Sequence, residues 1–521
     1  MSSRSSWRRK ISSTVSAGLL LLLAGGLALG GAGSASAAPL IRKEINSLTP
    51  TEVDNYRKGV ALMQTRAFTD PTGWIYQANM HGFPGNNAIC PVVGTPQPLW
   101  STCQHGSFFF LAWHRMYLYY FERILRASVR QAIHNPTYNF TLPFWNYATF
   151  HPLPAPFRSP ANSTNSLYVA QRSVNCNNGS TCVSATTASD TAAMGNLPFC
   201  SCSGGTCTGC TTGISPDESF GGGFLSAPNH SASFPGELEI QPHGAVHNAV
   251  GGPTGWMSYF TCAARDPIFW LHHANIDRLW QVWLNKLGGR KNPITNTSWA
   301  NQKFTFYDEN KQQVILTGCQ IVNMATQLGY QYSGVPVSNI QLCPTAPVTA
   351  AAAPTPSAAP TPPPTPPKIL AATAGAETRL GNAAVQVKVD LPAAVGQHMK
   401  SFAAAPPKPG HLRLVVEGIQ VLHPGAVYQV YLNLKAGQKP DPAGPAFLGN
   451  ISIFAEAEHS EPINRSFDLS RKAKALAAKG EVQLTFVRER LDQQAGLAAA
   501  PAALPEPTEF LRFTKVSIQE R

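Results

Sequence analysis

A proline-rich segment divides this chain of 521 residues into two parts of different character. Residues 347–367 read PVTAAAAPTPSAAPTPPPTPP, and nine of these 21 residues are proline. Proline fixes φ and has no backbone N–H, so the segment favours neither a helix interior nor a central strand. Such a composition is typical of a semi-rigid, solvated linker. We therefore expect a linker over residues 347–377 between two domains of ordinary size.

The part before the linker, residues 38–346, is predicted to be mainly helical. Its first helix is marked by a capping box of Thr49 and Glu52, with a proline in the first turn. Asp266 is a candidate N-cap for a later helix, whereas residues 155–235 have the composition of loops. The segments that indicate helices are 47–64, 108–132, 243–250 and 266–287.

The part after the linker, residues 378–521, has a different pattern. Short runs rich in Val, Ile, Leu and Phe partly alternate with polar residues, which is typical of strands. We expect a β-rich, sandwich-like domain here. The predicted strands occupy residues 411–421, 427–434, 450–458, 481–489 and 511–519.

Residues 1–37 have the three parts of an export signal: the basic RSSWRRK, the apolar LLLLLAGGLALGG, and small residues up to Ala37. The apolar run is too short and too rich in glycine to predict a membrane span. Arg8 and Arg9 leave open whether the signal is an ordinary one or a twin-arginine one, which would bring an export chaperone as a partner. We expect an exported protein of bacterial origin.

The charge of the chain argues against a nucleic-acid partner. The formal net charge is +12, and the four basic residues before Ile11 leave +8 once the signal is removed. The remaining surplus is spread along the chain without a basic run, so it indicates solubility.

Eleven cysteines suit an oxidising compartment. Six of them lie within residues 176–210, in a segment rich in Ser, Thr, Gly and Asn. This pattern predicts a loop held by disulfides, and a small metal-binding loop is the alternative. Because the total is odd, at least one cysteine has no disulfide partner within the chain.

Histidines on or beside the predicted helices form two groups of three. Imidazole suits copper, zinc, iron and nickel, but a zinc protease needs Glu directly after the first histidine of an HxxxH pair, and Gly244 stands there. A structural zinc site would recruit thiolates, so two all-histidine triads favour a pair of copper ions. The candidate ligands are His81, His105 and His114, then His243, His247 and one of the adjacent His272 and His273.

Two long motifs carry a family resemblance. HGSFFFLAWHRMYLYYFERIL and DPIFWLHHANIDRLW resemble the two copper-binding signatures of the tyrosinase and polyphenol oxidase (catechol oxidase) family of type-3 copper proteins. The resemblance covers about residues 40–335, includes Tyr330 and Tyr332, and extends loosely to the C-terminal domain. It implies a four-helix bundle around two copper ions. No segment resembles the intermediate domain of the plant enzymes, and the linker stands near its expected place.

The resemblance also implies roles for individual residues. It selects His273 over His272 as the sixth ligand and leaves His272 near the site. It implies a thioether between Cys103 and His105. Cys90 is the alternative cysteine for this bond, and a disulfide between Cys90 and Cys103 is the rival interpretation. The remaining roles are these: Glu239 orders a water near the second copper, Phe260 overhangs the second copper, and Asp277 orients a ligand ring.

The implied activity is oxidation of o-diphenols to o-quinones by O₂. Relatives with strong monophenol activity have Asn where this chain has Gly244, so weak ortho-hydroxylation of monophenols is expected. The C-terminal domain implies latency until a protease removes it. The alternatives are an o-aminophenol oxidase, an oxygen carrier of the haemocyanin kind, and a structural protein that uses copper only for folding.

Overall fold

The computed structural model describes residues 38–85, 89–203, 207–286, 288–339, 341–343, 367–373, 375, 377–404, 412–435, 437–454, 461–477, 479–491 and 506–521. The expected export signal and most of the expected linker lie outside these residues. Within the described ranges, no helix is long and apolar enough to cross a membrane.

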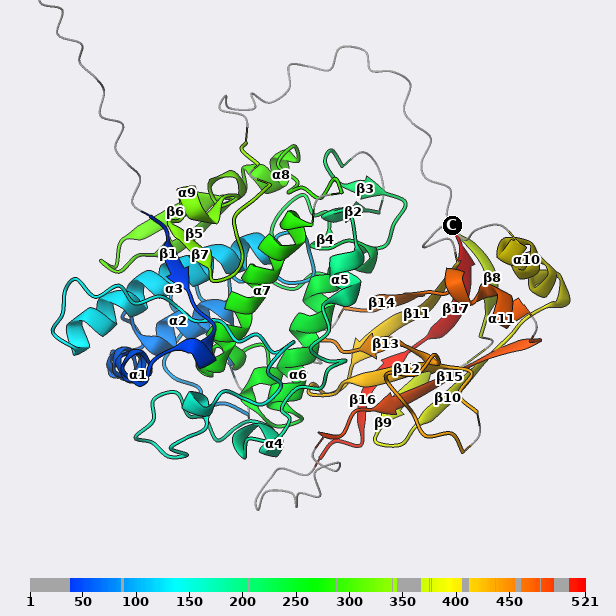
Figure 1. The fold of residues 1–521 in the computed structure, drawn as a ribbon, viewed down its shortest axis with the longest axis horizontal. Coiled ribbons are helices and arrows are strands. Elements are labelled where there is room, and N and C mark those ends of the chain that lie inside the picture. Colours follow the sequence, from blue (N-terminus) through cyan, green and yellow to red (C-terminus); the bar gives the residue numbers. More distant parts are fainter. Residues whose placement is uncertain are drawn as a thin grey trace, which may run out of the picture. The chain divides into compact units, whose positions relative to one another are not determined.

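The N-terminal part is a helical domain, drawn from blue to green in Figure 1. The capping box is confirmed: the Thr49 hydroxyl accepts from the Glu52 amide at 3.2 Å, and the Glu52 carboxylate accepts from the Thr49 amide at 2.8 Å. The helices are α1 (Pro50–Gln64), α2 (Trp74–His81), α3 (Phe110–Ala132), α4 (Val174–Asn177), α5 (Thr191–Gly195), α6 (Ala245–Gly251), α7 (Ile268–Asn285), α8 (Thr297–Ala300) and α9 (Met324–Gln327).

The long helix α3 is the centre of this domain. Sixteen of its 23 residues are buried, and it packs against α1 and α7. Gly59 of α1 permits the close approach to α3, because a Cβ there would lie 2.4 Å from Cγ2 of Val129. Short strands complete the domain: β1 (Leu40–Arg42) with β7 (Tyr330–Tyr332), β5 (Lys303–Tyr307) with β6 (Gln313–Thr317), and β2 (Cys200–Cys202) between β3 (Thr211–Thr212) and β4 (Gly222–Gly223).

The C-terminal part is a β domain of two sheets, drawn from yellow to red in Figure 1. One sheet has the order β10-β15-β12-β13, and the other has the order β8-β17-β11-β16-β9 with β14 paired to β11. The bounds are β8 (Lys368–Ala372), β9 (Thr378–Gly381), β10 (Val385–Asp390), β11 (Leu412–Val421), β12 (Tyr428–Leu432), β13 (Phe447–Ile451), β14 (Ile463–Asp468), β15 (Glu481–Arg488), β16 (Glu509–Phe513) and β17 (Lys515–Glu520), with helices α10 (Ala393–Ala404) and α11 (Ala473–Ala477).

The two sheets share one apolar core, as the predicted sandwich requires. Phe486 of one sheet and Phe513 of the other lie 5.2 Å apart between ring centroids, and buried residues of both sheets belong to the same cluster. The prediction of a helical domain followed by a β-rich domain is confirmed.

Three boundaries differ from the sequence predictions. Strand β8 lies inside residues 347–377, which were assigned to the linker, because it pairs with β17. Residues 511–519 form two strands, since the chain turns at Thr514. The predicted strand 450–458 ends at Ile451, and the next three residues leave the sheet.

Disulfides account for ten of the eleven cysteines. The pairs are Cys90–Cys262, Cys176–Cys182, Cys200–Cys210, Cys202–Cys207 and Cys319–Cys343. The six cysteines of residues 176–210 are therefore held by disulfides as predicted, and the alternative of a metal-binding loop is wrong. The rival Cys90–Cys103 pairing is also wrong, because Cys90 pairs with Cys262 and Cys103 is a buried free thiol.

Candidate metal centre

Four helices, one irregular helical segment and one loop bring the six predicted ligands together. His81 ends α2, His114 lies in the first turns of α3, His247 lies in α6 and His273 in α7. His243 belongs to a six-residue irregular helical segment, Glu239–Gly244, that leads into α6, and His105 lies in the loop before α3. All six imidazoles are buried.

The ring positions define two triads. Centroids within the first triad, His81, His105 and His114, are 5.0–5.7 Å apart, and those within the second, His243, His247 and His273, are 4.7–5.4 Å apart. The triads meet where His114 stacks on His273 with a centroid distance of 4.5 Å. Two adjacent sites of three imidazoles each result.

Backbone carbonyls set the orientation of four rings. The Nδ1 atoms of His81, His114, His243 and His247 lie 2.9, 2.8, 3.0 and 2.7 Å from the carbonyl oxygens of Phe260, Phe110, Glu239 and Met257. An Nδ1–H that donates to a carbonyl leaves the Nε2 lone pair free for a metal.

The chemical state of these rings fits metal ligation. Among the described residues, the Nε2 atoms of His81, His105, His114 and His243 have no hydrogen-bond partner, and a buried polar atom without a partner is costly. Burial lowers the pKa of His81 and of His243 to about 3, so both rings stay neutral at physiological pH. Neutral, oriented imidazoles with free Nε2 atoms are the donors that copper prefers.

His272 lies beside the second triad, as the resemblance implied. Its ring stacks on His243 at 5.3 Å, and the ligand atoms of His243, His247, His272 and His273 all lie within 4.8 Å of one another. Only His273 of the adjacent pair also groups with His81 and His114 of the first triad. This position between the two sites favours His273 as the sixth ligand.

Glu239 lies one turn before His243, as its spacing suggested. One carboxylate oxygen accepts from the Gly106 amide at 2.7 Å, and the other has no partner among the described residues. Burial raises the pKa of Glu239 to about 8. The side chain lines a cavity of about 50 Å³ together with His105 and His243, so it can hold or release a proton beside the centre.

Phe260 does not overhang the second copper site, so that prediction is wrong. Its ring lies 4.8 Å from His81 and 4.6 Å from His105, both of the first triad. The reason is local, because its carbonyl accepts from Nδ1 of His81 and holds the residue on that side. Phe260 therefore covers the first site.

Asp277 does not orient a ligand ring, and this prediction is also wrong. Its buried carboxylate accepts from Arg115 Nε at 2.5 Å and from the hydroxyls of Tyr330 and Tyr332 at 2.7 Å each, and it pairs with Arg42 at 3.4 Å. Two guanidinium groups outcompete a neutral imidazole for a carboxylate. Asp277 thus links α7 to α3, β1 and β7.

Cys103 lies between two histidines. Its Sγ is 3.5 Å from Nδ1 of His105 and 3.4 Å from Nδ1 of His230, and its thiol donates to the His81 carbonyl at 2.8 Å. His230 was missed at the sequence level, because it lies in a segment with the composition of a loop. The Cys103 thiol thus lies against the ring of His105, its expected thioether partner, and equally close to His230.

Phe454 of the β domain was also missed. Its ring stacks on His247 at 3.8 Å with an interplanar angle of 17°, and it lies 5.6–5.9 Å from His243, His105 and Phe260. The chain reaches this point because Ser452–Phe454, called the inserted segment below, leaves the sheet after β13. An aromatic ring of the β domain therefore lies over the second triad.

Gly244 gives the inserted segment its space. A Cβ at Gly244 would lie 3.3 Å from Cβ and 3.4 Å from the amide nitrogen of Phe454. Asn248, four residues after Gly244, binds the same segment. Its side-chain amide donates to Ser452 Oγ at 2.9 Å and to the Ile453 carbonyl at 3.0 Å. Both contacts belong to the surface that surrounds His247.

A helical bundle with two adjacent histidine triads is the architecture of a protein that binds two neighbouring metal ions. Comparison of the chain with known protein families identifies which family has this architecture. Residues 71–286 match the common central domain of tyrosinase, and residues 293–345 match the polyphenol oxidase middle domain. The second match corrects the expectation that no intermediate domain is present. This domain precedes the linker and comprises the segment from α8 to β7.

Relatives agree with this assignment. The chain is 34% identical over 316 residues to tyrosinase HcTyr1 of Hahella sp. (strain CCB-MM4), which is 56% of this chain and 63% of the relative. It is 31% identical over 317 residues to the latent form of the chloroplastic polyphenol oxidase of Prunus armeniaca, covering 58% of this chain and 49% of the relative. The chain thus spans about half to two thirds of these relatives.

Solved structures share the two-part fold. A latent aurone synthase (polyphenol oxidase) matches 93% of this chain and 90% of its own with a TM-score of 0.56 at 23% identity. A latent apple tyrosinase matches 92% of this chain and 97% of its own with a TM-score of 0.55 at 21% identity. The chain belongs to the tyrosinase and polyphenol oxidase family of copper proteins.

Proposed function

We propose that this protein is a type-3 copper polyphenol oxidase that oxidises o-diphenols to o-quinones while O₂ is reduced to water. The observation that carries the proposal is the pair of buried triads, in which four Nε2 atoms have no partner among the described residues and the Nε2 atoms of His247 and His273 lie 3.2 Å apart. His81, His105 and His114 would hold one copper ion, and His243, His247 and His273 the other. When bound, the two ions supply the electron exchange between the phenol and O₂.

The chain's own residues prepare this centre. Backbone carbonyls fix four of the six rings, so little reorganisation is needed when the metal binds. Burial keeps water from the site and keeps the imidazoles neutral. Phe260 covers the first triad and so guides an aromatic substrate toward the second.

Glu239 is the proton acceptor for the phenol hydroxyl in this proposal. Its carboxylate oxygen that has no partner among the described residues lies at the cavity beside His243, where it can accept a proton from a bound phenol. A diphenol carries two hydroxyl protons that must leave as it becomes a quinone, and Glu239 accepts one of them.

A preference for diphenols over monophenols rests on Gly244. Hydroxylation of a monophenol needs its phenol deprotonated first, and relatives active on monophenols have an Asn at this place that assists the deprotonation. Gly244 has no side chain for this task. The lining of the centre therefore supports oxidation of diphenols with weak monophenol activity.

The contacts of Phe454 support latency. A phenol that reaches the second copper must lie over His247, and the Phe454 ring lies there at 3.8 Å. The two rings cannot occupy one place, so the β domain must move or be removed before substrate binds. A protease that cuts between the domains is the activating partner in this proposal, and export in the latent form follows from the predicted signal.

A substrate panel on copper-loaded protein tests the proposed function. Monophenols, o-diphenols and o-aminophenols are supplied before and after limited proteolysis, and quinone formation is followed by absorbance. The proposal predicts fast turnover of 4-methylcatechol after proteolysis and slow turnover of tyrosol. O₂ bound reversibly without quinone would indicate a carrier and contradict the proposal.

A further inference from the structure

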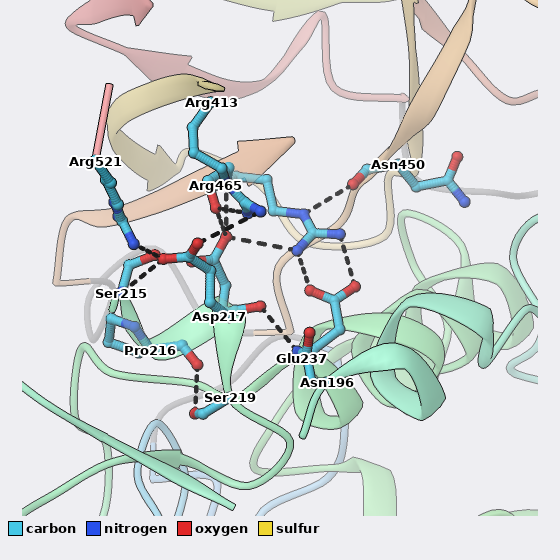
Figure 2. Close-up of polar contacts among 12 residues, drawn as sticks. Asn196, Ser215, Pro216, Asp217, Ser219, Glu237, Arg413, Asn450, Arg465 and Arg521 are labelled. Atoms are coloured by element: carbon cyan, nitrogen blue, oxygen red, sulfur yellow. Dashed lines mark hydrogen bonds and ion pairs between the residues drawn. The ribbon is translucent and has the colours of Figure 1, made fainter. Parts of the chain in front are cut away.

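A buried ionic cluster joins the β domain to the catalytic domain, outside the metal centre. Arg465 of β14 pairs with both carboxylate oxygens of Glu237, one of them at 2.8 Å, and lies 3.6 Å from Asp217 (Figure 2). All three side chains are buried. Arg413 and Arg521 of the β domain lie on Glu218 at the rim of the same cluster.

The cluster is linked to both sides of the contact between Phe454 and the copper ligands. On one side, Arg465 Nε donates to the carbonyl of Asn450, four residues before Phe454 (Figure 2). On the other, Glu237 lies two residues before Glu239, where the helical segment that carries His243 begins. One guanidinium thus joins the strand that presents Phe454 to the segment that presents a predicted copper ligand.

We propose that Arg465 is a positioning residue whose pairing with Glu237 holds the inserted segment in the copper centre and so maintains latency. The proposal rests on the latency argued above and adds the group that enforces it. It also states that the enzyme can be opened without cutting the chain, when this pair is broken.

Electrostatics explain why this pair, more than other contacts, controls opening. A buried charge that loses its partner is strongly destabilising, because it keeps its desolvation cost without compensation. Burial already raises the pKa of Glu237 although Arg465 opposes the shift. If Arg465 is removed, separation of the domains returns the Glu237 carboxylate to water, so the penalty favours the open arrangement without unfolding either domain.

A second contact joins the same two domains through donors that carry no charge. Ser466, next to Arg465, donates from its amide at 2.7 Å and from its hydroxyl at 2.8 Å to Asp217. These bonds keep Asp217 satisfied when Arg465 is replaced by an apolar residue. The unpaired group in such a variant is therefore Glu237, which makes the double substitution of Arg465 and Glu237 informative.

The test compares full-length, copper-loaded variants. Arg465→Met breaks the pair, and Arg488→Met is the matched control, because Arg488 is a buried arginine whose partners Asn382 and Glu506 lie within the β domain. Phe454→Ala is the positive control for latency. The readouts are diphenol turnover and hydrogen exchange of the peptide that covers β13 and the inserted segment, and exchange does not depend on activity.

We expect Arg465→Met to raise turnover at least about tenfold, since an unpaired buried carboxylate costs more than a factor of ten in the closing equilibrium, and to accelerate exchange in that peptide. Arg488→Met should change neither. Glu237→Leu combined with Arg465→Met should restore latency, because the carboxylate that loses its partner is gone and Asp217 keeps its hydrogen bonds from Ser466. If Arg465→Met does not fold, Glu237→Gln serves as the milder variant and should give a smaller change in the same direction.

Two results would overturn the proposal: wild-type turnover and exchange in Arg465→Met, or equal activation by Arg488→Met, which would mean that any loss of β-domain stability opens the centre. A different result separates the two claims. Accelerated exchange in Arg465→Met, with no gain in turnover there or in Phe454→Ala, supports the role of Arg465 and contradicts the proposed latency.

Discussion

The ring of Phe454 stacks on the imidazole of His247, with 3.8 Å between centroids and 17° between planes. One residue belongs to the β domain and the other is a predicted ligand of the second copper, 207 positions earlier in the sequence. The contact places an aromatic ring of the β domain over a predicted copper ligand of the same chain. It leads to predictions about Phe454 and Gly244, and the metal centre leads to further ones about the ligand set, Cys103 and Glu239.

Replacement of Phe454 should activate the intact protein. Phe454→Ala removes the ring that occupies the substrate position, and we expect at least about tenfold faster turnover of 4-methylcatechol by full-length enzyme. Because the ring is only partly buried, the cost in stability should be about 1–3 kcal/mol, less than for a core phenylalanine. Phe447→Ala, on β13 and away from the histidines, is the control, and equal activation by it would argue against a specific role of Phe454.

Substitution of Gly244 should alter two properties at once. Asn at this position meets the backbone of Phe454, so Gly244→Asn should raise activity in the full chain. After proteolysis the same variant should raise the ratio of tyrosol to 4-methylcatechol turnover by about three- to tenfold, which corresponds to about 1 kcal/mol of transition-state stabilisation.

Gly244→Ala separates bulk from chemistry in that experiment. It adds only the Cβ, which would lie 3.3 Å from Cβ of Phe454, and it should leave the substrate preference unchanged. An unchanged preference in Gly244→Asn after proteolysis would show that the missing amide does not determine the preference for diphenols.

The adjacent histidines should differ in copper content. His273 groups with histidines of both triads, whereas His272 groups only with those of the second triad. We expect His273→Ala to lose about half of the bound copper, as removal of one of three ligands weakens a site strongly. His272→Ala should retain its copper. Elemental analysis of dialysed protein measures this, and the reverse pattern would reassign the sixth ligand.

The Cys103 thiol should be consumed when copper and O₂ are supplied. A thioether between Cys103 and His105 removes two hydrogens from the chain, so the peptide that holds both residues should be lighter by that amount. His230 touches the same sulfur and should not be modified. An intact Cys103 thiol that still reacts with a thiol reagent after unfolding would contradict the thioether.

Glu239 should make the stability of the copper-free protein depend on pH. Burial raises its pKa from an ordinary value near 4.5 to about 8 in the folded state. The folded state keeps the proton while the unfolded state loses it, so this group's contribution is fully present below about pH 4.5 and is lost as the pH rises through about 8.

Glu239→Gln should remove that loss. We expect the variant's melting temperature to exceed that of the wild type at pH 8 and to approach it at pH 5. The buried histidines are the same in both proteins, so their contribution to stability cancels in the comparison. Their lowered pKa reduces stability as the pH falls below about 6.5, which is opposite to the effect of Glu239. A constant difference across the range would mean that Glu239 does not titrate as argued.

Local patterns in the sequence predicted local structure well. The capping box of Thr49 and Glu52, the helical course of α3 and α7, and the strands β11, β12 and β15 all depend on neighbouring residues, and each was found near its predicted bounds. The two long motifs contain His105, His114 and the adjacent pair His272 and His273, whereas His81, His243 and His247 were selected by their positions beside predicted helices and by the resemblance. The disulfide character of residues 176–210 also followed from composition alone.

Distant contacts explain the failures. Asp277 follows His273 by four residues and should face the same way, but Arg42 and Arg115 approach from other elements and take its carboxylate. Phe260 is held on the first triad by its own carbonyl, which no spacing to His273 reveals. Residues 450–458 have the alternation of a strand, and nothing local indicates that Phe454 enters another domain.

The stoichiometry of the catalysed reaction shows whether the protein oxidises diphenols with O₂ as proposed. Copper-loaded Phe454→Ala protein is given 4-methylcatechol in air, and quinone and O₂ are measured together. Because each diphenol gives two electrons and O₂ takes four on its way to water, we expect two quinones for every O₂ consumed. Uptake of O₂ without quinone, or no uptake by protein that carries its full copper, would contradict it.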